Sequence, residues 1–281
     1  MIFENKNLFN YLFYGLTDYK KYIKKHSLYK LIGISHLASI KKKIQKPNFS
    51  VDPNNLNPFP PEIDDLTRLH YLTTSRRVIS ILEFGVGKST IIFNDALIKN
   101  KKKYKTFVNK NLRKKNQFEC HSLDNQKAWI KKVKSNKLSN IKFYFASLKM
   151  GTFNDRVCTF YKKIPNVTPD LIYLDGPDQF SPKGHIRGIS TNHPDRLPMS
   201  GDILALEHFF YPGTLIVVDG RTANARFLKT NLQRDWIYCH NKNADQHFFE
   251  LREEPLGVYN KIQIDFCLGY KFYARLKKSN F

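Results

Sequence analysis

The sequence predicts an α/β fold, a doubly wound and mostly parallel sheet of seven strands with a helical N-terminal extension. Three observations predict it. Over about 200 residues, short apolar segments alternate with segments of helical spacing. Several of the short segments are almost continuously apolar, as in strands that are covered on both faces. Glycine or aspartate follows these segments, at the ends of strands where parallel sheets bind ligands.

The composition limits the classes of protein to consider. The chain has 281 residues and a formal net charge of +23, from 47 Lys and Arg against 24 Asp and Glu. Such a basic chain suggests nucleic acid as a partner, but the excess is lysine spread along the chain without an arginine cluster, so we do not favour it. The four cysteines form no C-x-x-C pair, which argues against zinc or disulfides and favours the cytoplasm. No apolar run reaches membrane-spanning length, and no secretory signal is recognisable.

The N-terminal part is expected to be an extension of the α/β domain. We divide the chain into residues 1–61, a basic helical extension with a proline-rich linker from Lys46 to Pro61, and residues 62–281, one α/β domain. Up to about Gln45, aromatic and aliphatic residues recur among lysines at roughly helical spacing. We expect this extension to pack on the domain. The alternative is an amphipathic helix in peripheral contact with an anionic membrane.

The most informative stretch of the domain is a buried strand followed by a glycine turn and a helix. Residues 78–84 form the apolar run of the strand. Gly85 and Gly87 then permit a sharp turn and the close approach of a ligand to the backbone. Ser89 or Thr90 can cap the helix that follows. The stretch therefore indicates a nucleotide-binding turn.

Three nucleotide-binding motifs compete for this turn. GVGKST is similar to the end of a phosphate-binding loop, but Leu82 stands where that motif needs its first glycine. The dinucleotide motif G-x-G-x-x-G/A is met at its first two glycines, but Thr90 replaces the third small residue. The third pattern is E-x-G-x-G, in which Glu83 supplies the acid two residues before Gly85.

The rest of the domain continues the alternation of strand and helix. A basic segment from Lys99 to Lys115 is expected to be a solvated loop, because it has no acidic residue. The second strand ends in Asp124, where a carboxylate can accept both hydroxyls of a ribose. We also expect strands at 141–148, 171–174 and 215–218, helices at 62–77, 125–134, 200–210 and 223–232, and a closing hairpin at 236–253.

In their order and strand context, these motifs resemble a class I S-adenosylmethionine-dependent methyltransferase. The resemblance rests on ILEFGVGKST, SLDNQ, PDLIYLDGPD and TLIVVDG, and it extends from about Asp64 to Glu254. It implies a Rossmann-like fold with S-adenosylmethionine as cofactor. Glu83 and the glycines would line the methionine end, Asp124 the ribose and Ser147 the adenine. The full set of implied cofactor-binding residues is Glu83, Gly85, Gly87, Ser89, Asp124, Ser147 and Asp175.

The resemblance also implies methyl transfer, and the sequence narrows the acceptor. Methyltransferases of nucleobase amino groups carry [ND]-P-P-[YF] at the fourth strand, where this chain has DGPD. No cysteine follows a proline, as methylation of a pyrimidine carbon usually requires. We therefore expect methylation of an oxygen on a small-molecule or glycan-linked acceptor. Two alternatives stay open: an RNA methyltransferase that uses the basic segment, and a non-catalytic methyltransferase-like binding module.

The catalytic candidates follow the fourth and fifth strands. Asp175 and Asp219 end neighbouring strands, and a similar pair holds magnesium in the catechol-type O-methyltransferases. That family has Asn after its second Asp, where this chain has Gly220, so Mg²⁺ is a secondary expectation beside capping or cofactor-orienting roles. The segment from Pro177 to Ser200 is expected to lie over the site. The catalytic candidates are Asp175, Asp178, His185 and His193, and the candidates for substrate binding are Arg187, Arg196 and Arg221.

Overall fold

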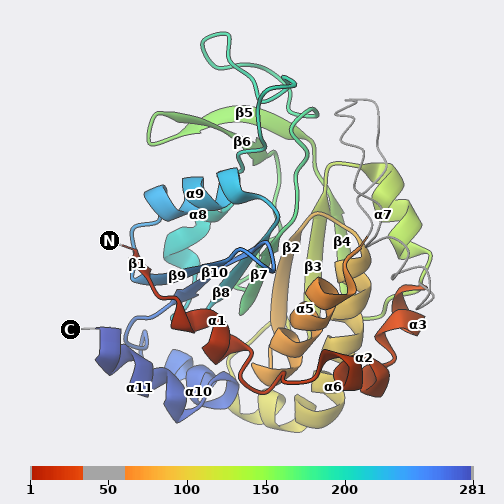
Figure 1. Ribbon diagram of the computed structural model, residues 1–281, viewed down its shortest axis with the longest axis vertical. Helices are drawn as coiled ribbons and strands as arrows, with labels where there is room; N and C mark the ends of the chain where they lie inside the picture. The colour runs from red at the N-terminus through yellow and green to blue at the C-terminus, as the bar shows by residue number, and fades with distance from the viewer. Residues whose placement is uncertain (1, 34–60, 280–281) are drawn as a thin grey trace.

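The computed structural model describes residues 2–33 and 61–279 (Figure 1). The strands of its central sheet are β1 (Phe3–Glu4), β2 (Ser80–Phe84), β3 (Glu119–Asp124), β4 (Ile141–Phe145), β7 (Leu171–Leu174), β8 (Leu215–Asp219), β9 (Trp236–Asn241) and β10 (Gln246–Leu251). A second sheet consists of β5 (Leu148–Phe153) and β6 (Arg156–Tyr161). The helices are α1 (Asn7–Leu12), α2 (Tyr19–His26), α3 (Leu28–Ile32), α5 (Ile63–Ser75), α6 (Lys88–Asn111), α7 (Lys127–Lys134), α8 (Asp202–Leu206), the 3₁₀ helix η1 (Glu207–Phe209), α9 (Thr222–Asn231), α10 (Val258–Cys267) and α11 (Tyr270–Ser279).

The central sheet has the order β1-β9-β10-β8-β7-β2-β3-β4. β3 and β4 extend it on one side of β2, β7 and β8 extend it on the other, and these five strands are parallel. The strand order therefore reverses between β2 and β7, the point at which a doubly wound sheet binds its ligand. β10 runs antiparallel to β8 and β9 and forms the predicted closing hairpin with β9. The predicted fold is confirmed, with eight strands rather than seven because β1 pairs with β9.

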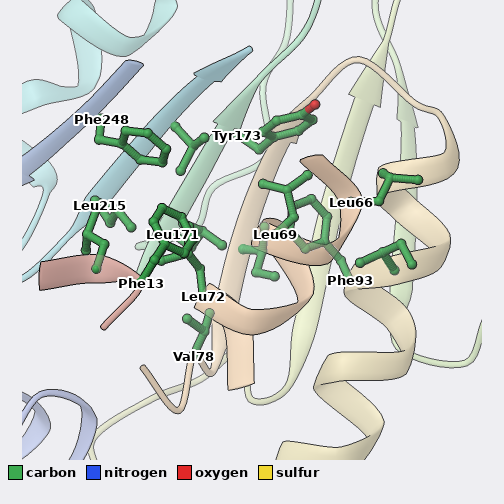
Figure 2. Packing of buried hydrophobic residues seen from close by; sticks show 14 of the residues in the cluster. Phe13, Leu66, Leu69, Leu72, Val78, Phe93, Leu171, Tyr173, Leu215 and Phe248 are labelled. Atoms are coloured by element: carbon green, nitrogen blue, oxygen red, sulfur yellow. The ribbon is translucent and has the colours of Figure 1, made fainter. Parts of the chain in front are cut away.

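Helices cover both faces of the sheet, and alternate residues of each strand supply two cores. On one face, Leu171 and Leu215 belong to the same core as Leu69 and Leu72 of α5 and Phe93 of α6 (Figure 2). On the other face, the next residue of each of these strands packs with α8 and α9. Full burial of such a side chain contributes roughly 1.5–3 kcal/mol. This two-sided burial is the reason that the strands form continuous apolar runs in the sequence.

The N-terminal extension is helical and packs against α5 and α6. Its apolar residues, such as Ile32, are buried in the core that α5 shares with the sheet. The hydroxyl of Tyr22 lies 2.7 Å from Nδ1 of His70, whose Nε2 lies 2.9 Å from Asp95 of α6. The predicted linker lies outside the described residues except for Pro61. Within the described ranges, no helix is long and apolar enough to cross a membrane.

The predicted loop from Lys99 to Lys115 is wrong for most of its length, because α6 continues to Asn111. Val108 is fully buried and packs with Phe266 of α10. Lysine is a good helix former. The lysine-rich segment can therefore remain helical, because apolar side chains about one turn apart pack against α10. The helix α10, which supplies this neighbour, and the C-terminal helix α11 were not predicted either.

The hairpin β5–β6 is a further element that the sequence analysis did not predict. Its strands are antiparallel, with Phe153 paired with Arg156. Asn154 and Asp155 between them have φ angles of 46° and 60°, as a two-residue hairpin turn requires. Figure 1 shows this hairpin above the central strands, with the segment that leads from β7 to α8 extending past it.

Candidate active site

The glycine turn after β2 lies directly against the end of β7. The N–H of Asp175 donates to the carbonyl of Phe84 at 2.9 Å, and the N–H of Gly85 donates to the carbonyl of Leu123 at 2.9 Å. Gly85 has a φ of +100°, and a Cβ at this position would lie 2.9 Å from the carbonyl oxygen of Asp175. A Cβ on Gly176 would lie 2.8 Å from the nitrogen of Gly85. Only glycine fits where these two backbones meet, at the reversal of the strand order.

Gly87 meets a different requirement. It is the N-terminal cap of α6, with extended backbone (φ −163°) that any residue can adopt. A Cβ there would have only the hydroxyl of Ser89 nearby, at 3.8 Å. The expected caps, Ser89 and Thr90, follow the cap instead, and Thr90 accepts the N–H of Gly87 at 3.1 Å. The fold therefore does not need glycine at 87, which leaves the open backbone at the helix N-terminus as its distinguishing feature.

Glu83 is the buried centre of the turn. Its carboxylate accepts hydrogen bonds from the hydroxyls of Ser89 at 2.6 Å and Thr90 at 2.8 Å, and from Ser122 of β3. Burial raises the pKa of Glu83 to about 7, although these hydrogen bonds oppose the rise. Glu83 and Ser89 were both predicted to contact a cofactor. In this structure they bind each other, so they hold the start of α6 against the end of β2.

Asp124, at the end of β3, binds both the glycine turn and the loop that follows β3. Its carboxylate accepts the N–H of Val86 at 2.8 Å and the N–H of Gln126 at 2.7 Å. It is 7% exposed, and burial raises its pKa. Ser147, the residue expected at the adenine, follows β4, and its carbonyl accepts the N–H of Lys162 at 2.9 Å. Asp124 and Ser147 thus flank the glycine turn at the carboxyl ends of successive strands.

Asp175 and Arg221 form an ionic group at the ends of β7 and β8. Arg221 donates to the carbonyls of Asp175 and Pro177, both at 2.6 Å, and its Nε lies 3.5 Å from the carboxylate of Asp175. The side chain of Asp175 is 52% exposed. Desolvation raises its pKa to about 6, and Arg221 opposes the rise. The carboxylate is therefore reachable and more basic than an ordinary aspartate.

The proposed magnesium pair is not supported. Asp219 accepts the hydroxyl of Tyr173 at 2.7 Å, and Asp175 has Arg221 as its cationic neighbour. In the part of the chain that the structure describes, no group of three or more His, Cys, Asp or Glu side chains could hold a metal ion. Mg²⁺ binding usually needs one or two carboxylates that are free to coordinate it.

Asp178, a predicted catalytic residue, organises the loop after β7. Its carboxylate accepts the side-chain amide of Asn125 at 2.8 Å, the N–H of Phe180 at 2.8 Å and both the N–H and the hydroxyl of Ser181. Burial alone would raise its pKa, but these bonds, led by Ser181, lower it below the usual value. A carboxylate with so many donors is suited to fixing the loop and poorly suited to accepting a proton.

The other loop candidates are not gathered at the strand ends. The side chains of His185 and Arg187 are exposed near a turn that joins Ile186 to Ile189. The ring of His193 accepts the N–H of Asp195, and Arg196 donates to the carbonyl of Ser190, within the same loop. Among the described residues, no hydrogen bond or ion pair joins any of the four candidates to Asp175. Of the predicted substrate-binding residues, the structure brings Arg221 alone to this carboxylate.

Tyr161 is a residue of this region that the sequence analysis missed. It is the last residue of β6, 4% exposed, and its ring stacks on Phe84 with ring centroids 5.9 Å apart. The signal in the sequence was the alternation in MGTFNDRVCTFY around an Asn-Asp turn. That pattern is typical of a hairpin, but it does not indicate that the last tyrosine stacks on the residue before the glycine turn.

A hollow of about 520 Å³ lies elsewhere, among the residues around β1, α1 and the end of β9. Lys6, His240 and Lys242 are among its lining residues. None of the site residues predicted from the sequence lines it. The chemistry at the reversal of the strand order, rather than this volume, identifies the candidate active site.

The strand order and the glycine turn define a Rossmann-like α/β protein. No known protein family and no curated protein matches the chain. Among solved structures, the chain is similar to the SAH-bound methyltransferase PaMTH1 of Podospora anserina, with 10% sequence identity and a TM-score of 0.41. The similarity covers 69% of this chain and 80% of that chain. At this level it adds nothing to what the strand order itself shows.

Proposed function

We propose that the chain is an S-adenosylmethionine-dependent methyltransferase of class I that methylates a hydroxyl of a small-molecule or glycan-linked acceptor. One observation carries the proposal. The backbone of the E-x-G-x-G turn contacts the backbone of Asp175, whose side chain is half exposed, where the strand order reverses. This contact joins a nucleotide-type turn to a titratable group on the neighbouring strand.

The residues at the strand ends fit S-adenosylmethionine. The backbone at Gly87 is open at the N-terminus of α6 and can lie against the methionine part. Asp124 and Ser147 end the next two strands, on the side proposed for the adenosine part. When bound, the cofactor supplies a methyl group that its sulfonium already activates. The chain then has to hold the acceptor in line and remove its proton.

Asp175 is the proposed base. Its pKa of about 6 leaves most of the carboxylate ionised at neutral pH, while it remains basic enough to accept a proton as the oxygen is methylated. Arg221 lies beside the carboxylate, with its Nε 3.5 Å away, and it also donates to the backbone carbonyl of Asp175. In this proposal Glu83 and Asp178 act indirectly, because they position the turn and the loop.

The cofactor part of the proposal is tested by calorimetry with S-adenosylmethionine and S-adenosylhomocysteine. The wild-type chain is expected to bind both, and Gly87→Ala is expected to raise both dissociation constants at least tenfold, about 1.4 kcal/mol. The same variant should stay within about 1 kcal/mol of wild-type stability, since its backbone is extended and its Cβ meets no close neighbour. Absence of binding at millimolar ligand would overturn the proposal. Wild-type affinity in Gly87→Ala would show that the turn does not contact the cofactor.

The acceptor part is tested by transfer of a labelled methyl group. Phenols, soluble glycans and total RNA are offered to wild type and to Asp175→Asn. We expect the wild type to label a glycan or a phenol. In Asp175→Asn the rate of this transfer should fall by about 10²–10⁴-fold, with little change in cofactor affinity. Labelled RNA alone would replace the hydroxyl acceptor with the RNA alternative. Equal rates in wild type and Asp175→Asn would show that Asp175 is not the base.

A further inference from the structure

The hairpin β5–β6 is fixed to the candidate site from two sides. The N–H of Tyr161 lies 3.2 Å from the carboxylate of Asp202, at the start of α8. The N–H of the next residue, Lys162, donates to the carbonyl of Ser147 after β4 at 2.9 Å. The ring of Tyr161 stacks on Phe84, the residue immediately before the glycine turn. The tyrosine is thus held in one place by β2, β4 and α8.

The hydroxyl of Tyr161 is buried, and the residues that the structure describes offer it no hydrogen-bond partner. An unsatisfied buried hydroxyl costs about 1–3 kcal/mol. Phenylalanine would supply the same ring without this cost, so the fold alone does not explain the hydroxyl. The charged groups that act on it are those of the candidate site and its surroundings: Asp124, Asp202, Arg221 and Asp178. Burial also raises the pKa of Tyr161 well above its usual value, so the phenol stays protonated and can donate.

We propose that Tyr161 is a ligand-binding residue whose hydroxyl donates a hydrogen bond to the adenosine half of the cofactor. The inference rests on the proposed function. The position of the ring favours the adenosine half, because it stacks on Phe84 at the end of β2 and the next residue, Lys162, binds the carbonyl of Ser147, the residue expected at the adenine. Asp175 belongs to the other side of the strand reversal, where the acceptor is proposed.

Tyr161→Phe tests the inference through two measurements of opposite sign. Without ligand, the variant is expected to melt at the same or a higher temperature than wild type, because it removes an unsatisfied polar group. Its dissociation constants for S-adenosylhomocysteine and for adenosine are expected to rise about 3–10-fold, the worth of one hydrogen bond. The thermal shift that S-adenosylhomocysteine produces should shrink accordingly. A tyrosine with a purely structural role would not give this combination.

Tyr238→Phe is the matched control. Tyr238 is also 4% exposed, but its hydroxyl lies 2.8 Å from Nδ1 of His247 in the β9–β10 hairpin. This control is expected to lose stability and keep wild-type affinity. Wild-type affinity in Tyr161→Phe, while the wild-type chain binds the ligand, would overturn the inference and leave the proposed function standing. Failure of the wild-type chain to bind either ligand would overturn both.

Discussion

Gly85 and Gly87 lie two residues apart in one turn, but different physical conditions act on them. The backbone of Gly85 has a positive φ and faces the backbone of Asp175 and Gly176 at close range. The backbone of Gly87 is extended and open. The fold therefore requires glycine at 85, whereas glycine at 87 leaves the backbone accessible to a ligand.

Gly85→Ala is expected to lower the free energy of unfolding by about 3 kcal/mol or more. A non-glycine residue at a strained positive φ costs about 1–3 kcal/mol, and the added Cβ also meets backbone atoms of Asp175 that cannot turn aside. Urea unfolding followed by circular dichroism measures the loss. The comparison with Gly87→Ala is the control, and equal stability of the two variants would contradict this account of the turn.

At the residue scale, the sequence predicted which positions end the strands but not which atoms meet there. The acids at 124, 175 and 219 were identified because polar residues directly follow or end apolar runs. The partners of Glu83 were not identifiable in this way. Ser122 is opposite Glu83 only because of the register between β2 and β3, and a register is a property of the assembled sheet. The raised pKa of Glu83 follows from the same burial.

At the scale of elements, the prediction succeeded where one element carries a strong signal of its own. β2, β7 and β8 were found from their apolar runs, and α5 from the acidic residues at its start and the arginines at its end. α6 was predicted too short because its second half is exposed on most sides and is held by contacts with α10. The two-residue β1 was not predictable, since only its pairing with β9 makes it a strand.

The arginine cluster around Glu250 shows how β10 is joined to two helices. Arg76 at the end of α5, Arg252 and Arg275 of α11 donate to the Glu250 carboxylate at 2.8, 2.8 and 3.1 Å. The carboxylate is fully buried. Burial alone would raise the pKa of Glu250, but the three arginines hold it well below its ordinary range. The carboxylate and the three guanidinium groups therefore make with one another the interactions that water would otherwise supply.

Glu250→Gln is expected to lower the free energy of unfolding by about 3–5 kcal/mol, because it leaves the buried guanidinium groups without a counter-charge. Glu253→Gln is a suitable comparison. Glu253 pairs with Arg234, but its side chain is 21% exposed, and its loss should cost about 1 kcal/mol. Guanidinium unfolding of both variants measures the difference. A cost below about 1 kcal/mol for Glu250→Gln would show that the cluster does not hold these elements together.

At the scale of the whole molecule, two sets of buried groups act on stability in opposite directions as pH changes. Burial raises the pKa values of Glu83 and Asp202 to about 7, so the folded chain holds protons that the unfolded chain has lost above about pH 4.5. Burial lowers the pKa values of His26 and His247 to about 4, so here the unfolded chain holds the extra protons up to about pH 6.5. Rising pH therefore destabilises the fold through the acids and stabilises it through the histidines.

The free energy of unfolding is accordingly expected to change little between about pH 5 and 6.5, where the two sets oppose each other. Between pH 6.5 and 8 the unfolded histidines lose only their remaining protons, so the ionisation of Glu83 and Asp202 in the folded chain outweighs them and should lower the free energy of unfolding by about 1 kcal/mol. Urea unfolding at half-unit steps of pH measures the profile. Glu83→Gln should remove most of the decline, because its amide cannot ionise. A free energy that rises from pH 6.5 to 8 would contradict the assignment, since it requires a group that the folded chain deprotonates more readily than the unfolded chain.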